Sequence, residues 1–162
     1  METKQVVQFI RTKSEAKVPT KAFPTDIGFD LTAISVEKQI SDNTFLFNTG
    51  IIVIPPKGFY VEIVPRSSLS KTGWMLSNSV GTIDPSFRGP LLIALTKVDD
   101  SNKCWLPDEL PFTRCQLILR HAVDFTLQPT LGFENTDRGD GGFGSTDNPR
   151  LIEPTNELSQ QG

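Results

Sequence analysis

The sequence predicts an all-β fold, and three features of the chain indicate it. Short runs rich in β-branched and aromatic residues recur along its 162 residues, and 12 prolines and 12 glycines separate them. No segment keeps the sustained 3.6-residue period of an amphipathic helix. Many short strands divided by turn residues are typical of a sandwich or barrel. We see no repeat and no second domain, so one core is expected.

The expected elements follow one another with few interruptions. Pro19 and Pro24 exclude a helix after the first strand, and 99–111 reads as a polar loop. One or two helical turns are expected at 67–73, capped by Ser67 and ended by Gly73. The run 91–95 is apolar on both faces, which predicts cover on both and suggests a subunit interface. Strands are expected at 6–10, 27–33, 45–54 with a polar break at 48–50, 59–64, 74–76, 80–83, 91–95, 114–119 and 123–127.

Composition excludes several classes of protein. Hydrophobic residues make up 37% and charged residues 22%, and no apolar run approaches the ~20 residues of a membrane span. The net charge of −3 argues against a nucleic-acid surface, although a few well-placed cations suffice for a small phosphorylated ligand. We therefore expect neither nucleic acid nor membrane as a partner.

The scarce reactive residues narrow the chemistry further. Cys104 and Cys115 form no CxxC pattern, which predicts two free thiols in a reducing compartment and argues against zinc. His121 is the single histidine, so a Ser-His-Asp triad is not expected and a structural role is. No signal-type segment opens the chain, which predicts a cytoplasmic protein, with a nucleus or an infected host cell left open.

The middle of the chain carries an isolated acid. Asp84 stands between the apolar run 80–83 and a turn at Pro85. Asp followed by Pro favours a type I turn, so these two residues alone indicate turn formation before catalysis. Both roles remain open at this point.

Other polar segments share a preference for phosphate. Arg138 precedes a glycine-rich run whose backbone N–H groups can converge on an anion, and Phe143 can stack on a flat ring; a flexible tail is the alternative. Arg66 leads into two hydroxyls at a helix start, where simple capping is the alternative. Gln116 and Asp30 are polar residues in apolar strands. Together these groups fit a nucleoside phosphate site.

The order of these segments resembles the trimeric dUTP pyrophosphatases (dUTPases), which carry five motifs in a fixed order. The third and fifth motifs are specific, while the first and fourth mean little alone. The matching segments are 28–31, 65–69, 78–89, 115–117 and 138–146. The resemblance implies a distorted jelly-roll (β-clip) subunit of a homotrimer, with active sites shared between chains and a mobile C-terminal arm. It divides the chain into a β-domain at 1–136, a closing arm at 137–147 and a polar extension at 148–162, expected to be disordered.

The resemblance also implies an activity and roles for individual residues. The activity is hydrolysis of dUTP to dUMP and pyrophosphate, which limits uracil in DNA and supplies dUMP for thymidylate synthesis. Asp84 is the implied general base, and Mg²⁺ is held by the triphosphate and water, with Asp30 in support through water at most. The implied substrate contacts are Asn78, Gly81 and Ile83 for uracil, Phe87 for deoxyribose, Arg66, Ser67, Ser68 and Gln116 for the phosphates, and Arg138, Phe143, Gly144, Ser145 and Thr146 in the arm.

Two departures from the family pattern are informative. Phe87 stands where the family usually has tyrosine, so ring stacking is kept and a hydroxyl is lost. In the fourth motif Thr113 takes the usual arginine position and Arg114 follows one residue later. A one-residue slip on a strand turns a side chain to the opposite face, so the usual role is not assigned to Arg114.

Two other functions compete with dUTP hydrolysis. A dCTP deaminase or a bifunctional relative would have a similar fold and similar motifs, but deamination needs a glutamate where this chain has Ala94, and alanine cannot transfer a proton. A non-catalytic regulatory trimer is the second alternative, and the retained Asp84 and Arg66 argue against it. An enzymatic dUTPase is the prediction.

Overall fold

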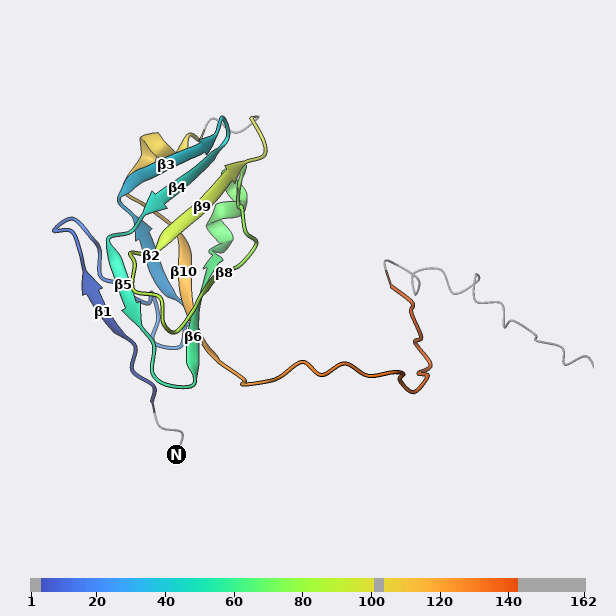
Figure 1. Ribbon diagram of the computed structural model, residues 1–162. Helices are drawn as coiled ribbons and strands as arrows, with labels where there is room; N and C mark the ends of the chain where they lie inside the picture. Colours follow the sequence, from blue (N-terminus) through green and yellow to red (C-terminus); the bar gives the residue numbers. More distant parts are fainter. Residues whose placement is uncertain (1–3, 101–103, 143–162) are drawn as a thin grey trace, which may run out of the picture. The chain divides into compact units, whose positions relative to one another are not determined.

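The strands of the molecule are short and antiparallel, as Figure 1 shows. The computed structural model describes residues 4–100 and 104–142. The chain divides into two units, Met1–Asp124 and Phe125–Gly162, each of which is described by itself. All named elements lie in the first unit, and they confirm the predicted all-β class.

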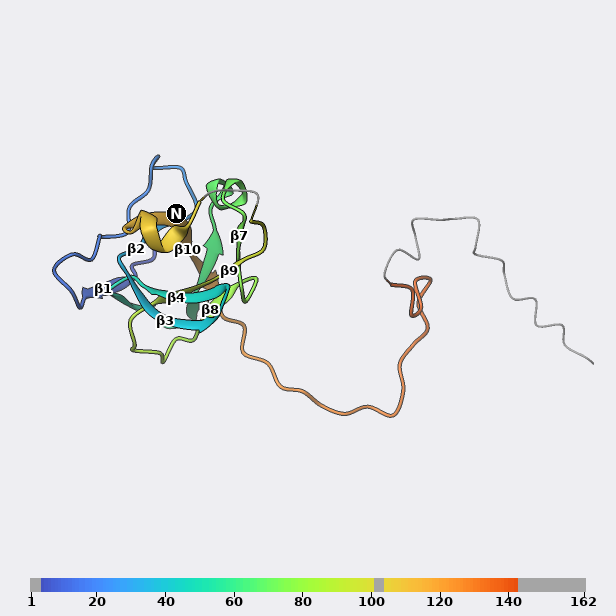
Figure 2. The same ribbon diagram turned by 90° about the horizontal axis from the view of Figure 1, so that it is seen from above.

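In the described part of the chain, the strands form three sheets (Figures 1 and 2). The small sheet pairs β1 (Gln8–Arg11) with β5 (Ile51–Ile54). The second sheet has the order β2 (Phe29–Ala33), β10 (Phe112–His121), β6 (Phe59–Pro65) and β8 (Gly81–Ile83). The third has the order β3 (Ser35–Ser41), β4 (Thr44–Asn48), β9 (Leu92–Lys97) and β7 (Trp74–Leu76). Two short 3₁₀ helices are η1 (Ser67–Lys71) and η2 (Leu106–Glu109).

The core lies between the two four-stranded sheets because each contributes one apolar face. Phe47 on β4 and Phe112 on β10 meet edge to face, with ring centroids 4.9 Å apart. Leu31 and Ile93, from opposite sheets, have no exposed surface. Burying a side chain of this kind stabilises the fold by about 1.5–3 kcal/mol. Alternate residues of each strand are thereby committed to the core, and the others remain for the surface and the site.

Both cysteines are free thiols, as predicted. Cys115 is fully buried in this core, and desolvation raises its pKa to about 12. Burial also raises the pKa of Cys104, to about 11, with help from a hydrogen bond to Glu109. Both thiols therefore stay protonated and unreactive at neutral pH.

Three expected features differ in the structure. Ser35–Ser41 forms an edge strand, which its exposed polar residues concealed, and η2 lies inside the expected loop. The expected strand at 123–127 is not formed, although Val123, Phe125 and Leu127 alternate and are more than 70% exposed. A strand needs a neighbour for its backbone hydrogen bonds, and the described part of this chain provides none for it. On β9, Leu92 and Ala94 are only half-buried, so the expected cover on the second face stays a prediction.

Candidate functional site

A polar cleft of about 300 Å³ opens where β2, β10 and the end of β6 meet. Antiparallel pairing places Gln116 opposite Asp30 on one side and Val64 on the other. Arg66 directly follows β6, so its side chain reaches the same place. The cleft is lined by Ala22, Asp26, Ile27, Gly28, Asp30, Arg66, Ser67, Gln116 and Ile118. Four predicted site residues are thus brought together by strand pairing.

Arg66 is held in this cleft by two neighbours. Its Nε lies 3.0 Å from Oδ1 of Asp30, and its Nη1 donates to the carbonyl oxygen of Thr113 at 3.2 Å. The Arg66 and Asp30 side chains remain 34% and 27% exposed. A partly exposed ion pair of this kind is worth only about 0–1 kcal/mol, so an incoming phosphate can compete for the guanidinium at little cost.

A bulge in β10 explains the altered fourth motif. Between the pairs Phe112–Ala33 and Cys115–Leu31, β10 has one residue more than β2. Thr113 uses its hydroxyl for Thr32, 2.8 Å away, and its carbonyl for Arg66. Arg114 pairs instead with Glu109 at 3.1 Å and does not line the cleft. Arg114, to which the family's usual arginine role was not assigned, therefore lies outside the cleft.

The helical turns after Arg66 differ in one respect from the expectation. Ser67 is the first residue of η1, whose preceding residue Arg66 has extended backbone, and no side chain caps the helix. The expected cap by Ser67 was therefore wrong, and Ser67 lines the cleft instead. The expected end at Gly73 is confirmed, because Gly73 has a φ of 72° that favours glycine. The Ser68 hydroxyl oxygen is buried, and no group of the described residues bonds to it.

A second group of predicted residues lies on β8 and the loops beside it. Ser79 has a φ of 60°, a strained value for a residue with a side chain, and the N–H of Val80 donates to the carbonyl of Asn78 at 2.6 Å. This tight turn leads into Gly81, which is buried against Ile63 of β6. Ile83, half-buried, ends the strand directly before Asp84.

Asp84 begins the turn that its sequence predicts. The N–H of Phe87 donates to the carbonyl of Asp84 at 3.0 Å. Arg88 donates from Nη1 to the carbonyls of Pro85 and Phe87 at 2.7 and 2.8 Å, which ties the turn together. The Phe87 ring, 44% exposed, lies over Gly89, where a Cβ would come within 2.6 Å of its Cζ. Asp84 is exposed and held on a loop of fixed geometry.

Gln116 and the end of β8, where Asp84 follows, lie far apart within one copy of the chain. Ile83 pairs with Val61, and Val61 pairs with Leu119, three residues along β10 from Gln116. The end of β8 therefore lies about 10 Å along the strands and two strands, about 10 Å, across from Gln116. A single phosphate or base cannot contact both Gln116 and Asp84 across these distances, although Arg66 and Ser67 share a second hollow, of about 440 Å³, with Ser79.

The predicted arm belongs to the second unit. Arg138 lies in an exposed turn, where its Nε donates to the carbonyl of Gly141 at 3.2 Å. Gly139 has a φ of 53°. The other predicted arm residues, Phe143, Gly144, Ser145 and Thr146, lie outside the described residues.

Several side-chain oxygen atoms that could coordinate a metal ion line the polar cleft. Asp26 and Asp30 supply carboxylates and Gln116 an amide oxygen, which are ligand types that Mg²⁺ accepts. Asp26 is already engaged by the N–H of Phe23, and Asp30 by Arg66. Among the described residues, no three acidic, cysteine or histidine side chains gather as a metal cage. The cleft thus suits a metal that brings most of its own ligands.

Sequence reasoning missed three residues of these groups. Gly28 lines the cleft beside Gln116, Thr113 holds Arg66 through its carbonyl, and Ser79 carries the strained turn. Only Gly28 gave a signal, as part of the first motif. The other two act through their backbones, which a sequence pattern does not display.

Comparisons with known proteins agree on one family. The profile of the dUTPase family matches residues 14–147. A deoxyuridine 5'-triphosphate nucleotidohydrolase of Shewanella sp. (strain ANA-3) is 35% identical over 144 residues, covering 83% of this chain and 89% of that protein. The protein of that name from Pseudomonas putida (strain W619) is 34% identical with the same coverage.

Solved structures share the fold. A mutant dUTPase of Staphylococcus bacteriophage 80alpha with dUpNHpp gives a TM-score of 0.71 at 20% identity, covering 87% of this chain and 98% of that one. A mutant dUTPase of phage phi11 of S. aureus, described with a structural Mg(II) ion, gives a TM-score of 0.65 at 18% identity, covering 80% of this chain and 99% of that one.

In the described residues, no helix has the length and apolar character to cross a membrane.

Proposed function

This chain belongs to the dUTPase family and is a dUTP diphosphatase, and we propose that Asp84 activates the water that attacks the α-phosphorus of dUTP. The products are dUMP and pyrophosphate, so the reaction limits uracil in DNA and supplies dUMP for thymidylate synthesis. The observation that carries the assignment is an exposed carboxylate on a loop fixed by Arg88. A positioned general base contributes about 10²–10⁴ in rate.

The polar cleft is the proposed phosphate site. Arg66 offers a planar fork of donors, Ser67 a hydroxyl and Gln116 an amide. Arg66 neutralises charge, and the other two fix the orientation of the triphosphate, which is where most catalysis of phosphoryl transfer arises. Ser68 joins them in this proposal, because a buried hydroxyl without a partner costs about 1–3 kcal/mol until a ligand or a second chain satisfies it.

The β8 region is the proposed site for the nucleoside. Backbone groups around Gly81 and Ile83, with the amide of Asn78, supply fixed donors and acceptors for the edge of uracil. Phe87 offers an exposed ring face to the deoxyribose, which leaves no room for a 2′-hydroxyl. Arg138 and residues 143–146 are proposed to close over the bound nucleotide, with Phe143 stacked on the base.

Mg²⁺ is the proposed cofactor, entering with the triphosphate. It supplies charge neutralisation at the phosphate oxygens when bound. Asp30 is the residue of this cleft proposed to support the metal, through a bridging water. Direct coordination is not proposed, because the Asp30 carboxylate is already paired with Arg66. Mg²⁺ commonly keeps several waters and substrate oxygens in its shell, which agrees with a cleft of few carboxylates.

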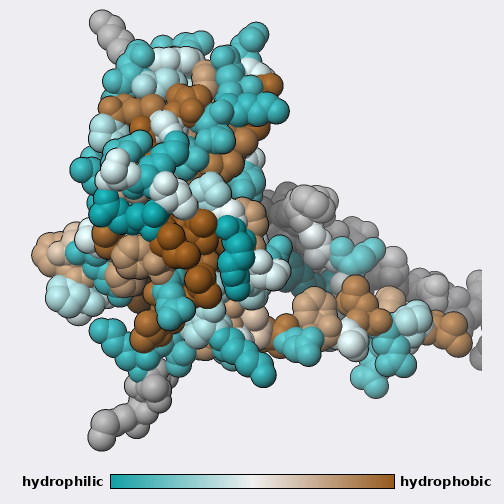
Figure 3. Space-filling model, turned by 60° about the vertical axis from the view of Figure 1, so that its left-hand side comes forward, coloured by the Kyte–Doolittle hydropathy of each residue, from teal (hydrophilic) through white to brown (hydrophobic). Residues whose placement is uncertain are grey.

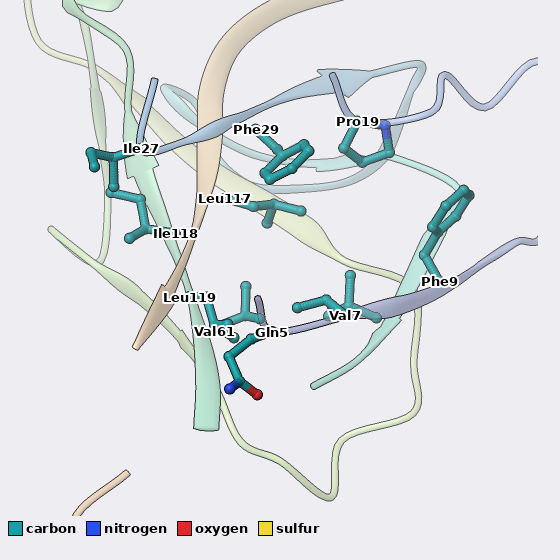
Figure 4. Close-up of a pocket in the computed structure, with 11 residues that line it drawn as sticks. Gln5, Val7, Phe9, Pro19, Ile27, Phe29, Val61, Leu117, Ile118 and Leu119 are labelled. Atoms are coloured by element: carbon teal, nitrogen blue, oxygen red, sulfur yellow. The ribbon is translucent and has the colours of Figure 1, made fainter. Parts of the chain in front are cut away.

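A homotrimer with shared active sites is the proposed assembly. The separation of Gln116 from β8 within one chain supports it, because a second copy can bring the two groups together. A further support is an apolar hollow of about 230 Å³ beside β1, where Phe9 and Phe29 are each 45% exposed. Figure 3 shows apolar residues gathered on this face, and Figure 4 shows Val7, Phe29 and Leu117 around one space. Exposed apolar surface of this kind marks an association site.

Two free thiols support action in the reducing interior of a cell, and the cytoplasm is the proposed location. A dCTP deaminase is disfavoured by the residue at position 94. Ala94 lies inside β9, paired with Leu46, and offers no carboxylate for proton transfer.

One assay tests the function against both alternatives. The purified protein with Mg²⁺ is incubated with dUTP, dCTP and UTP, and both pyrophosphate and ammonia are measured. We expect pyrophosphate from dUTP and almost none from dCTP or UTP, with no ammonia from any of them. Ammonia from dCTP would contradict a function limited to dUTP hydrolysis, and no turnover at all would favour the regulatory trimer.

A further inference from the structure

Gly28 occupies a special place in the phosphate cleft. It directly precedes β2, and it lines the cleft together with Asp30. A Cβ at Gly28 would lie 2.1 Å from Oε1 of Gln116, 2.8 Å from its Cδ and 3.1 Å from its Cγ. The Gln116 amide therefore fills the volume that any other residue at this position would need.

The need for glycine here is one of space. The described glycines with a positive φ are Gly50, Gly58, Gly73 and Gly139, and Gly28 is not among them. Its φ therefore lies outside the left-handed region that favours glycine. The three heavy atoms nearest to the missing Cβ all belong to the flexible side chain of Gln116, which can swing away without moving the backbone. Alanine would thus move Gln116 and leave the fold intact.

Gln116 is seated between two fixed points. Its Nε2 donates to the carbonyl of Pro65 at 3.2 Å, and its Oε1 lies over Gly28. The residue opposite it across the β2–β10 pair is Asp30, which is occupied by Arg66. Gly28 and Pro65 together therefore determine where the amide of Gln116 lies in the cleft.

We propose that Gly28 is a positioning residue for Gln116, which leaves the space in which the Gln116 amide lies to meet the triphosphate. The proposal rests on the function proposed above. Gly28 itself touches no substrate in it, and its whole effect on hydrolysis passes through Gln116.

A double-mutant cycle tests the proposal. Gly28→Ala, Gln116→Ala and the double variant are assayed for kcat and KM with dUTP. We expect each single change to lower kcat/KM by about 10-fold or more, as the loss of a hydrogen bond to a charged group predicts. In the Gln116→Ala background, Gly28→Ala should change kcat/KM by less than about twofold. Losses that multiply in the double variant, or an unaffected Gly28→Ala enzyme, would overturn the proposal.

Gly58→Ala is the matched control. Gly58 lies in the turn between β5 and β6 with a φ of 82°, and apart from its chain neighbours no described residue comes within 4 Å of a Cβ there. Alanine should lower Tm through backbone strain and leave kcat and KM unchanged. Gly28→Ala should leave Tm nearly unchanged and lower kcat/KM. If Gly28→Ala unfolds the protein even in the Gln116→Ala background, where the space is free, glycine is needed for the backbone and the proposal is wrong.

A readout without turnover separates this proposal from the proposed function. The side-chain amide signals of Gln116, assigned by their loss in Gln116→Ala, are followed by NMR in the ¹⁵N-labelled protein without nucleotide. We expect Gly28→Ala to shift them and Gly58→Ala to leave them in place. If the wild type does not hydrolyse dUTP but these shifts occur, the proposed function is wrong, while the placement of the Gln116 amide by Gly28 is supported. Unshifted signals in Gly28→Ala would refute the seating itself.

Discussion

The polar cleft and the β8 loops hold their residues in different ways. Arg66 is placed by Asp30 of β2 and the carbonyl of Thr113 on β10, both distant in the sequence. Asp84 is placed by a turn closed within four residues and by Arg88, three residues beyond Pro85. Long-range pairing thus builds the phosphate side, and local backbone geometry builds the side that carries the proposed base.

This difference has a consequence for the response to mutation. A side chain held by long-range contacts can be displaced by substitutions in any of several strands or the loops beside them. Gly28 illustrates this for Gln116. A residue held by its own turn depends on few neighbours, so substitutions there should affect chemistry without disturbing the sheet. Each of the following predictions tests one side of the comparison.

The largest effect is expected at the locally held acid. Asp84→Asn should lower kcat by about 10²–10⁴ because the water loses its general base, while KM for dUTP changes little. The turn should survive, since it is closed by backbone groups and Arg88. Steady-state kinetics and the binding of dUpNHpp, a dUTP analogue, measure the two parts.

Asp42→Asn is its matched control, because Asp42 is an exposed acid in the turn between β3 and β4, away from both groups. It should leave kcat unchanged. An Asp84→Asn enzyme with nearly normal turnover would reject Asp84 as the base and remove the catalytic half of the comparison.

The same difference explains what the sequence could predict. Asp-Pro chemistry indicated the turn at Asp84, and alternation indicated most strands, because both signals are local. The ion pair of Arg66 with Asp30 and the role of the Thr113 carbonyl depend on strand order and on a bulge in β10. No short sequence pattern predicts either of these two contacts. The prediction of a strand at 123–127 was wrong for a related reason, since alternation predicts a strand but not the neighbouring strand that it needs.

A smaller effect is expected on the phosphate side. Arg66→Ala should lower kcat/KM for dUTP by about 10- to 150-fold, mainly through KM, because a charged hydrogen-bond donor worth about 1.5–3 kcal/mol is lost. Arg66→Lys should recover part of it, since lysine keeps the charge and loses the fork.

Arg114→Ala is the matched control for Arg66→Ala. It removes an ion pair of similar length, 3.1 Å against 3.0 Å, from a residue that does not line the cleft. It should leave kcat/KM within about twofold, because exposed pairs contribute little. Equal losses at Arg114 and Arg66 would mean that the cleft is not the phosphate site.

The smallest expected signal tests whether the two sides come from different copies. Arg66→Ala and Asp84→Asn chains are co-expressed with different tags, and the mixed assemblies are purified and assayed at dUTP concentrations well below KM, where both single variants should be slow. If each site takes its cleft from one copy and its β8 loops from another, random mixing should restore about a quarter of the sites. Mixing Arg66→Ala with Gln116→Ala, two changes on the same side, should restore none. Activity that stays at the level of the single variants in both mixtures would place each complete site within one chain, and a conformational change in β8 would then have to bring Asp84 to the cleft.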